Sequence, residues 1–322
     1  MPDISVIIPT YGREEVLLDS IAAVLAQRPA ELIVVDQTGQ HRPEVSSQLD
    51  RWDSQGDIRW LRVAPPSIPR AMNRGLREAE NELVLFLDDD IVPGTHLLNA
   101  HYLAHQQFPD AWAIVGRVLQ PGETSGPAPR NGWTREGLSA DMGFPFWSDQ
   151  PEWVSNVMAG NLSVKRGPAI GCGGFDEHFT GAAYRFETEF ARRVIRQGGR
   201  IRFEPRASIR HLRAESGGTR AKGNHLASAS PRHGIGDYYF ALRQGITRET
   251  VWYMARRPWR EVATRFHLRR PWFIPVKLIG ECRALVGALR LVRRPPKLIG
   301  WDESVGGAEE LTATLNAAER TT

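Results

Sequence analysis

Short apolar runs alternate with stretches of helical periodicity over the first 120 residues of the chain. The apolar runs predict strands at 4–9, 31–36, 58–63, 83–88 and 113–118, and the periodic stretches predict helices at 14–26, 69–80 and 97–107. This alternation is typical of strand–helix–strand units around a mostly parallel sheet. We therefore expect an α/β fold with a Rossmann-like sheet flanked by helices, and a ligand site outside the carboxyl ends of its strands.

The next part of the chain has a weaker pattern. Residues 120–150 are rich in Gly, Pro, Ser and Trp and keep no sustained period, which predicts a long surface loop. Regular pattern returns as a strand at 161–165, a helix at 187–197, and short strands at 200–203 and 208–211.

Beyond residue 238 the pattern is helical, with breaks at several prolines. In 276–294 one predicted helical face carries Leu278, Cys282, Leu285, Leu289 and Val292, and Arg283, Arg290 and Arg294 lie away from it. Residues 251–300 contain twelve Lys or Arg against two Glu, a net charge of +10, whereas the whole chain carries +4. Together with Trp252, Trp259 and Trp272, this basic segment fits an anionic membrane surface, and packing of the helix against the rest of the protein is the alternative.

Composition limits the class of protein. With 322 residues, of which 41% are hydrophobic, the chain can bury a full core. Cys172 and Cys282 are too few for a disulfide framework, and no apolar run reaches the roughly 18 to 20 residues of a membrane-spanning helix. The first residues do not resemble a signal peptide. We therefore expect a cytoplasmic protein that does not cross a bilayer.

The apolar run at 83–87 ends in three consecutive carboxylates, Asp88, Asp89 and Asp90. Adjacent carboxylates repel one another unless a cation offsets their charge. Hard divalent cations that bridge phosphate groups are bound by one or two such carboxylates. The pattern therefore favours a metal site over the alternative of a solvated acidic turn.

Six segments then follow one another in a characteristic order: 5–11 (SVIIPTY), 31–36 (ELIVVD), 69–75 (PRAMNRG), 88–90 (DDD), 173–177 (GGFDE) and the helix near Glu187. In this order they resemble the family 2 glycosyltransferases, whose fold is called GT-A. The resemblance covers about residues 4–220. It implies an enzyme that moves a sugar from a nucleotide-diphosphate donor to an acceptor hydroxyl.

The resemblance implies a set of donor-site residues. The nucleotide pocket would be lined by Pro9, Thr10, Tyr11 and Asp36, with Arg70 and Asn73 near the base and the diphosphate, and Asp89 beside them. Asp88 and Asp90 would form the DxD motif that holds manganese or magnesium. From the residues alone, Asp36 also fits a turn and Arg70 a surface ion pair.

One departure from the family follows the second strand. The family usually has Asp-Asp-Gly-Ser there, whereas this chain has Asp36-Gln37-Thr38-Gly39. Because the second acid is missing, the choice among uridine, thymidine and guanosine donors stays open.

The resemblance further implies inversion at the sugar, with a catalytic base in the helix near residue 186. Glu187 takes the place of the base, where the family often has Asp, and Glu189 is its rival. A base acts within about 2.6 to 3.2 Å of the hydroxyl that it deprotonates. Acids in a first helical turn are also favoured simply by the helix dipole, so a structural role is the alternative.

Further site residues follow from the same resemblance. His211 is expected to complete the metal shell as a neutral imidazole, and Arg220 to bring charge to the diphosphate from a loop at 217–220. A packed histidine and a plain connector are the alternatives. The acceptor face is expected to include Trp153, Gly160, Asn161 and Glu189. Trp is more often simply buried, which leaves Trp153 open.

These expectations divide the chain into three parts. We expect a GT-A catalytic domain at 1–235, a helical basic extension at 236–300 and a flexible tail at 301–322. Within the domain, 1–119 would bind the nucleotide sugar and 120–235 the acceptor.

The function predicted from the sequence is metal-dependent, inverting glycosyl transfer of the hexosyltransferase type, in cell-surface polysaccharide or glycolipid synthesis. Expected partners are a nucleotide-diphosphate sugar, a carbohydrate or lipid-linked acceptor and, through 251–300, an anionic membrane at the inner face of the plasma membrane; nucleic acid is not expected, because no binding module accompanies the charge. One alternative is a non-catalytic carbohydrate- or membrane-surface-binding protein with a degenerate transferase fold. Another is a sugar nucleotidylyltransferase, whose Gly-rich loop is reduced here to a single glycine, Gly12.

Overall fold

The centre of the protein is one mixed sheet. The computed structural model describes residues 2–129, 133–218 and 225–300. Within them, nine strands form the sheet in the order β3-β2-β1-β4-β8-β6-β9-β5, with β7 paired to β9. The strands are β1 (Ile4–Thr10), β2 (Glu31–Asp36), β3 (Arg59–Arg62), β4 (Leu83–Leu87), β5 (Ile91–Pro93), β6 (Ala111–Leu119), β7 (Glu152–Val154), β8 (Asn161–Lys165) and β9 (Arg200–His211).

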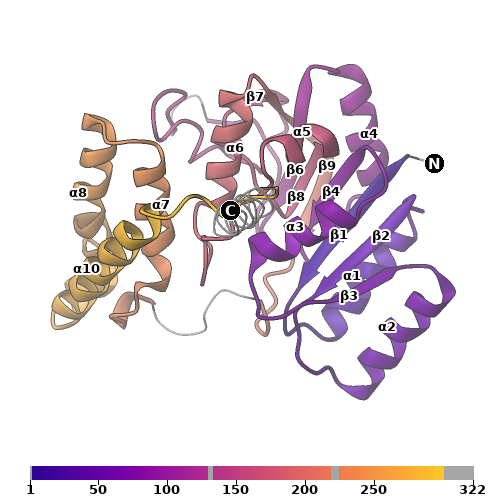
Figure 1. Ribbon diagram of the computed structural model, residues 1–322, viewed down its shortest axis with the longest axis horizontal. Coiled ribbons are helices and arrows are strands. Elements are labelled where there is room, and N and C mark those ends of the chain that lie inside the picture. The colour runs from indigo at the N-terminus through magenta and orange to yellow at the C-terminus, as the bar shows by residue number, and fades with distance from the viewer. Residues whose placement is uncertain (1, 130–132, 219–224, 301–322) are drawn as a thin grey trace, which may run out of the picture.

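Helices cover both faces of this sheet (Figure 1). On one face lie α3 (Ile68–Glu78), α5 (Arg166–Gly171) and α6 (Phe186–Arg196), and on the other α1 (Glu15–Leu25), α2 (Pro43–Gln55) and α4 (Leu97–Gln107). Each face of the sheet has its own hydrophobic core. In β1, Ile7 packs in the core beneath α3, α5 and α6, whereas Val6 and Ile8 pack in the core beneath α1, α2 and α4. Burial on both faces explains why the strands appear in the sequence as continuous apolar runs.

Two pairings of the sheet bring distant segments to the end of β4. Strands β1 to β4 are parallel, but β8 runs antiparallel to β4, with Asn161 opposite Leu87, so that Gly160 lies beside Asp88. Strand β5 pairs with β9 so that Ile91 is opposite His211, and the Leu212 amide donates to the Asp90 carbonyl at 2.8 Å. The carboxylates of 88–90 therefore meet residues from β8 and β9.

A buried network of hydrogen bonds joins β8 to α4. Asn161 and Ser163 both bond to His101, at 2.8 and 2.9 Å, and Ser163 bonds to His105 at 2.9 Å. Burial lowers the pKa of His101 to about 4 and that of His105 to about 3, so both rings are neutral at pH 7. Asn161 also donates to two backbone carbonyls. Its side chain is therefore committed to holding the strand.

The strands and helices predicted for the first 120 residues are confirmed to within two residues. Helix α2 was not predicted, because Val45 and Leu49 are its only buried residues and give too sparse an apolar period. Its boundaries did carry a signal: Pro43 begins it, and Gly56, with φ of 75°, ends it. The two short strands predicted after α6 are in fact one strand, β9.

The sequence predicts a surface loop at 120–150, but part of this segment is buried. Its described residues contain no helix or strand, but Phe144 and Phe146 lie in the core and pack edge-on against Phe203 of β9. Aromatic residues in a segment without period gave no sequence signal for this burial.

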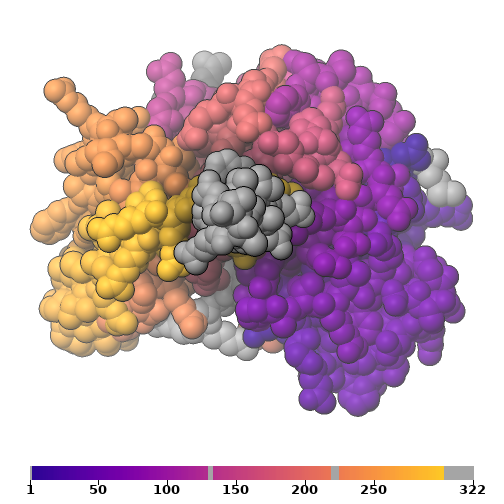
Figure 2. All heavy atoms as spheres, viewed as in Figure 1, coloured from indigo at the N-terminus to yellow at the C-terminus, as the bar shows by residue number. Residues whose placement is uncertain are grey.

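The C-terminal helices form one end of the molecule (Figures 1 and 2). They are α7 (Ile235–Arg243), α8 (Arg248–Val262), α9 (Arg265–Arg269) and α10 (Phe273–Val292), preceded by the short turns η1 (His225–Ala227) and η2 (Pro231–His233). Tyr238, Tyr239 and Phe240 of α7 belong to the same core as α3 and α6. Among the described residues, no helix is both long enough and apolar enough to span a membrane.

The apolar face predicted for α10 packs only in part: Leu285 and Val292 contact the core, whereas other residues of that face are exposed. Gly280, Ala284 and Ala288 are its buried small residues, whereas Leu278 and Leu289 are 37% and 41% exposed. Beside α7, a Cβ added to Gly287 would lie 2.7 Å from Cδ1 of Ile235, so small residues are what let the helix approach. Hydrophobicity alone predicts the wrong residues at this contact, because close packing against α7 depends on small side chains.

Candidate functional site

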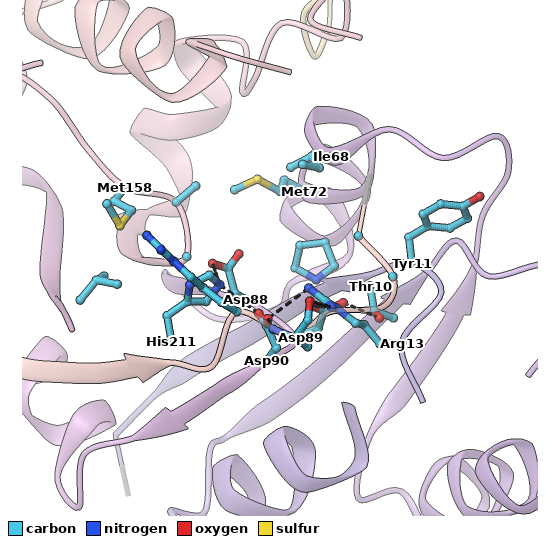
Figure 3. A pocket seen from close by; sticks show the side chains of 18 of the residues that line it. Thr10, Tyr11, Arg13, Ile68, Met72, Asp88, Asp89, Asp90, Met158 and His211 are labelled. Carbon is cyan, nitrogen blue, oxygen red and sulfur yellow. Dashed lines mark hydrogen bonds and ion pairs between the residues drawn. The ribbon is translucent and has the colours of Figure 1, made fainter. Parts of the chain in front are cut away.

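A cavity of about 520 Å³ opens at the carboxyl ends of β1 and β4 (Figure 3). Its lining comes from segments far apart in the sequence: 9–13, α3, 88–90, 118–120, 158–160, the start of α6, and 211–218. We call it the central cavity. The location agrees with the ligand position expected for open α/β sheets.

Three potential metal ligands meet on one side of the central cavity. One ligand atom each from Asp88, Asp90 and His211 lies within 4.8 Å of the other two. The Nε2 atom of His211 is 3.1 Å from Oδ1 of Asp90 and 3.8 Å from Oδ2 of Asp88. Gly160 makes room for this group, because a Cβ there would lie 2.2 Å from the Asp88 carboxylate.

The hydrogen bonds around His211 determine which of its nitrogens carries a proton. Oε1 of Gln120 accepts from Nε of Arg213 at 2.8 Å and lies 3.0 Å from Nδ1 of His211. Because arginine can only donate, this atom of Gln120 is the oxygen, and Nδ1 of His211 must be the donor. In a neutral ring, the Nε2 lone pair then faces Asp90. Two acceptors at that distance repel unless a proton or a metal cation lies between them, so this arrangement fits a cation.

Arg13 supplies a positive charge to Asp89 and Asp90. Its guanidinium donates to Asp89 at 3.2 Å and to Asp90 at 3.1 Å, and also to the carbonyls of Ala214 and Ser216. Thr10 donates to Asp89 at 2.7 Å. Arg13 therefore ties the segment 214–216 to the acidic end of β4.

Asp89 and Asp90 respond differently to this environment. Burial raises the pKa of Asp89 to about 6, against the opposing effects of Arg13 and Thr10. Burial would also raise the pKa of Asp90, but without a metal ion the proton between Nε2 of His211 and Asp90, together with the Ala214 amide and Arg13, outweighs it and lowers that pKa. Asp90 is therefore the carboxylate that the fold keeps ionised.

Glu187 lines the central cavity from the first turn of α6, near the Asp88 side. Its Oε1 accepts a hydrogen bond from the Ala159 amide at 2.6 Å. The residue before α6, Arg185, has the left-handed φ of 74° and is held by the buried carboxylate of Asp237 at 2.9 Å. Asp237 also binds Arg257 of α8, so the C-terminal helices help to fix the start of α6.

Several residues predicted for the donor site line the central cavity, and others do not. Pro9, Thr10, Tyr11 and the three carboxylates line it. Asp36 does not, because it is buried and bound to His41 at 2.8 Å and to Trp60 at 3.0 Å. Arg70 lines a different cavity on the other side of α3. Asn73 is buried and bonds to the backbone of Phe175 in both directions, at 2.7 Å each.

The residues predicted for the acceptor are also divided. Gly160 lines the central cavity, whereas the side chain of Asn161 is buried and hydrogen-bonded to His101 and to the Arg117 carbonyl. Glu189 is buried in an ion pair with Arg193 at 2.7 Å. Trp153 packs edge-on against Phe108 and lies under Arg200. Arg220 falls outside the described residues, so its predicted position stays a prediction.

Arg13, Gln120 and Arg213 were not predicted from the sequence. Arg13 had a signal, since it comes three residues after the end of β1 and the carboxyl ends of β1 and β4 are adjacent. Gln120 and Arg213 had none, because their role depends on how β6 and β9 align in the sheet.

The sequence model of Glycosyl transferase family 2 matches residues 5–187. The chain belongs to this family. The sequence is also 25% identical over 235 residues to the O-antigen biosynthesis protein RfbC of Myxococcus xanthus, an alignment that covers 68% of this chain and 18% of RfbC.

Two solved structures share the fold of this family 2 chain. The crystal structure of GalNAc-T7 with UDP, GalNAc and Mn2+ matches 76% of this chain and 51% of its own, with a TM-score of 0.56 and 15% identity. The crystal structure of S. aureus TarS matches 78% of this chain and 41% of its own, with a TM-score of 0.52 and 13% identity. The chain therefore has the GT-A fold, and it spans about half or less of each of these relatives.

We predict that Arg13→Gln destabilises the protein in EDTA by about 3 to 5 kcal/mol, because it leaves buried carboxylates without their counter-charge. The loss should be larger at pH 8 than at pH 5. The pKa of the Asp89 carboxyl is raised to about 6 in the folded protein, so the folded protein becomes less stable as the pH rises through that value. Urea unfolding at both pH values measures the effect.

The matched control is Arg51→Gln, which removes an exposed arginine of α2 whose side chain bonds to Gln48. It should change the free energy of unfolding by less than about 0.5 kcal/mol. Equal unfolding curves for the Arg13 variant and the control would show that Arg13 does not neutralise the cluster.

Proposed function

We propose that this chain transfers a sugar from a nucleotide-diphosphate donor to an acceptor hydroxyl, with a divalent metal ion and with inversion at the anomeric carbon. The observation that carries the proposal is the meeting of Asp88, Asp90 and His211 with Glu187 in one cavity at the carboxyl ends of the strands. Membership of Glycosyl transferase family 2 supports the reaction class. The GalNAc-T7 structure, with UDP, GalNAc and Mn2+, supports the class of donor and cofactor.

The metal would be held by Asp88, Asp90 and Nε2 of His211. The geometry fits, since Nε2 faces the Asp90 oxygen and Nδ1 is held by Gln120. An imidazole ligand favours Mn2+ over Mg2+, because nitrogen is a softer donor than oxygen. When bound, a divalent ion neutralises the diphosphate and makes it a better leaving group.

The donor would lie along the β1 side of the central cavity. Pro9, Thr10 and Tyr11 are proposed to contact the nucleotide, and Arg13 to keep the segment 214–216 folded over the diphosphate. Asp36, Arg70 and Asn73 are not proposed as direct contacts, since their side chains are engaged or directed elsewhere. Arg220, outside the described residues, stays a proposed diphosphate contact.

Glu187 is the proposed catalytic base. Its hydrogen bond with the Ala159 amide orients the carboxylate at the cavity wall, next to Gly160. The acceptor hydroxyl would donate its proton to Glu187 while its oxygen attacks the anomeric carbon and the diphosphate leaves from the opposite side. Glu189 is a weaker candidate because Arg193 holds both of its carboxylate oxygens.

The proposed acceptor is the growing end of a cell-surface polysaccharide or glycolipid. The similarity to an O-antigen biosynthesis protein supports this class. A lipid-linked acceptor would bring the enzyme to a membrane surface, and the C-terminal helices fit such a surface. Trp252, Trp259 and Trp272 are 66%, 74% and 65% exposed, in the same segment that carries the net charge of +10.

The packing of these helices supports the membrane proposal. Helix α10 uses small residues against α7 and leaves larger ones, such as Ile279 and Leu289, exposed. An exposed apolar surface among arginines is typical of segments that bind at the interface of an anionic bilayer. In the proposed arrangement the basic end of Figure 2 (orange to yellow) lies on the inner face of the plasma membrane.

We predict that Glu187→Gln lowers kcat by about 10² to 10⁴-fold while donor affinity changes little, because the amide keeps the shape but cannot accept the proton. Steady-state kinetics and donor titration give the two quantities. Glu44→Gln, at an exposed position of α2, is the control. Proton NMR of the wild-type product should show the anomeric configuration opposite to the donor's. Retention, or a Glu187 variant with normal kcat, would exclude this role.

We predict that the protein sediments with vesicles of phosphatidylglycerol and phosphatidylcholine but not with vesicles of phosphatidylcholine alone. Replacing the three exposed tryptophans by Ser should weaken binding at least tenfold, about 1.4 kcal/mol. High salt should weaken it as well. Leu103→Ser, which removes an exposed apolar residue of α4, is the control. Equal sedimentation of the triple variant and the control would contradict the proposal.

A further inference from the structure

Helix α3 separates two cavities of opposite charge. Ile68 and Met72 line the central cavity, which contains the three adjacent carboxylates. Arg70, Arg74 and Arg77 lie on the other side of the helix and line a second cavity of about 480 Å³. Arg62 and Lys297 also line the second cavity. We call it the α3 arginine pocket.

The α3 arginine pocket has a large excess of positive charge. Glu177 is the acidic residue of its lining, and it is already paired with Lys297 at 3.3 Å and bonded to Asn73 at 3.0 Å. Arg74 is paired with Glu78 at 2.9 Å, but Glu78 also binds Arg59 at 2.8 Å. The carboxylates in reach are therefore shared among more cations than they can neutralise.

Three arginines of the pocket have no ion pair among the residues that the structure describes: Arg62, Arg70 and Arg77. Arg62 stacks on the ring of Trp60, with its guanidinium carbon 4.0 Å from the centroid. Nη2 of Arg70 is buried and, within the described part of the chain, has no hydrogen-bond partner. A buried donor without a partner costs about 1 to 3 kcal/mol, and more when it is charged.

An anion in the pocket would reduce the repulsion among the guanidinium groups and would accept hydrogen bonds from those that face it. Phosphate groups match this chemistry best, because the planar guanidinium fork binds phosphate oxygens in pairs. A diphosphate offers enough oxygens for several arginines at once.

We propose that the α3 arginine pocket binds a phosphate or diphosphate group without a metal ion. The site is distinct from the metal-assisted donor site proposed above. It lies on the opposite side of α3, and Glu177 is its one lining carboxylate among the described residues, which is too few for a divalent cation. The phosphate can belong to a soluble ligand or to a lipid headgroup, and the chemistry of recognition is the same.

The test is isothermal titration calorimetry of the whole 322-residue chain with inorganic pyrophosphate in the presence of EDTA. Without metal, the α3 arginine pocket should still bind, with saturation at one site. The double variant Arg74→Gln/Arg77→Gln should bind at least tenfold more weakly, because hydrogen bonds to charged groups contribute about 1.5 to 3 kcal/mol each. Both side chains are exposed, so the variant should fold normally. Arg51→Gln, on α2, controls for the loss of a surface arginine outside the pocket and should bind like the wild type.

A second titration, with short-chain soluble phosphatidic acid, separates the two sources of phosphate. Tighter binding than pyrophosphate would assign the pocket to a lipid headgroup, and weaker binding to a soluble ligand. Absence of pyrophosphate and phosphatidic acid binding in EDTA, or equal binding by the double variant, would overturn the proposal. Binding of the donor nucleotide with Mn2+ should be unchanged in the double variant, so failure of this site is distinguishable from failure of the donor site.

Discussion

Three adjacent carboxylates at the end of a buried strand impose the main electrostatic constraint on this protein. Asp89 and Asp90 are buried, and neither can stay ionised there without compensation. The fold supplies it from separate segments: Arg13 after β1, His211 at the end of β9, and the Ala214 amide beyond it. The antiparallel pairing of β5 with β9 brings the last two into place. Much of the sheet topology thus serves to gather counter-charges around β4.

The same constraint accounts for the chemistry of the central cavity. Arg13 occupies one oxygen of Asp90, and the other faces Nε2 of His211. Because Gln120 accepts the proton on Nδ1 of His211, a second proton or a metal cation must lie between Nε2 and Asp90. Glu187 lines the same cavity from the start of α6 and accepts a hydrogen bond from the Ala159 amide. The proposed metal ligands and the proposed base therefore come from different segments of the chain and line one cavity.

Much of the fold could be predicted from the sequence, because β1, β2 and β4 are buried on both faces and read as plain apolar runs. The acidic site was visible for the same reason, since polar residues end an apolar strand. Contacts made by tertiary alignment were not visible: Gln120 with His211, or Asp36 with His41 and Trp60. The packed face of α10 was predicted only in part, because close approach to α7 needs small residues such as Ala284 and not the most hydrophobic ones.

The proposed metal site of Asp88, Asp90 and His211 is tested most directly by titrating the wild type and three variants with Mn2+. Electron paramagnetic resonance measures the concentration of free ion at each step. We expect one bound ion in the wild type and affinity at least tenfold weaker in Asp90→Asn and in His211→Gln, which remove proposed ligands. Asp89→Asn should retain most of the affinity, because Asp89 is bound by Arg13 and Thr10 and is not part of the ligand group. No binding by the wild type, or a loss in Asp89→Asn equal to that in His211→Gln, would contradict the account.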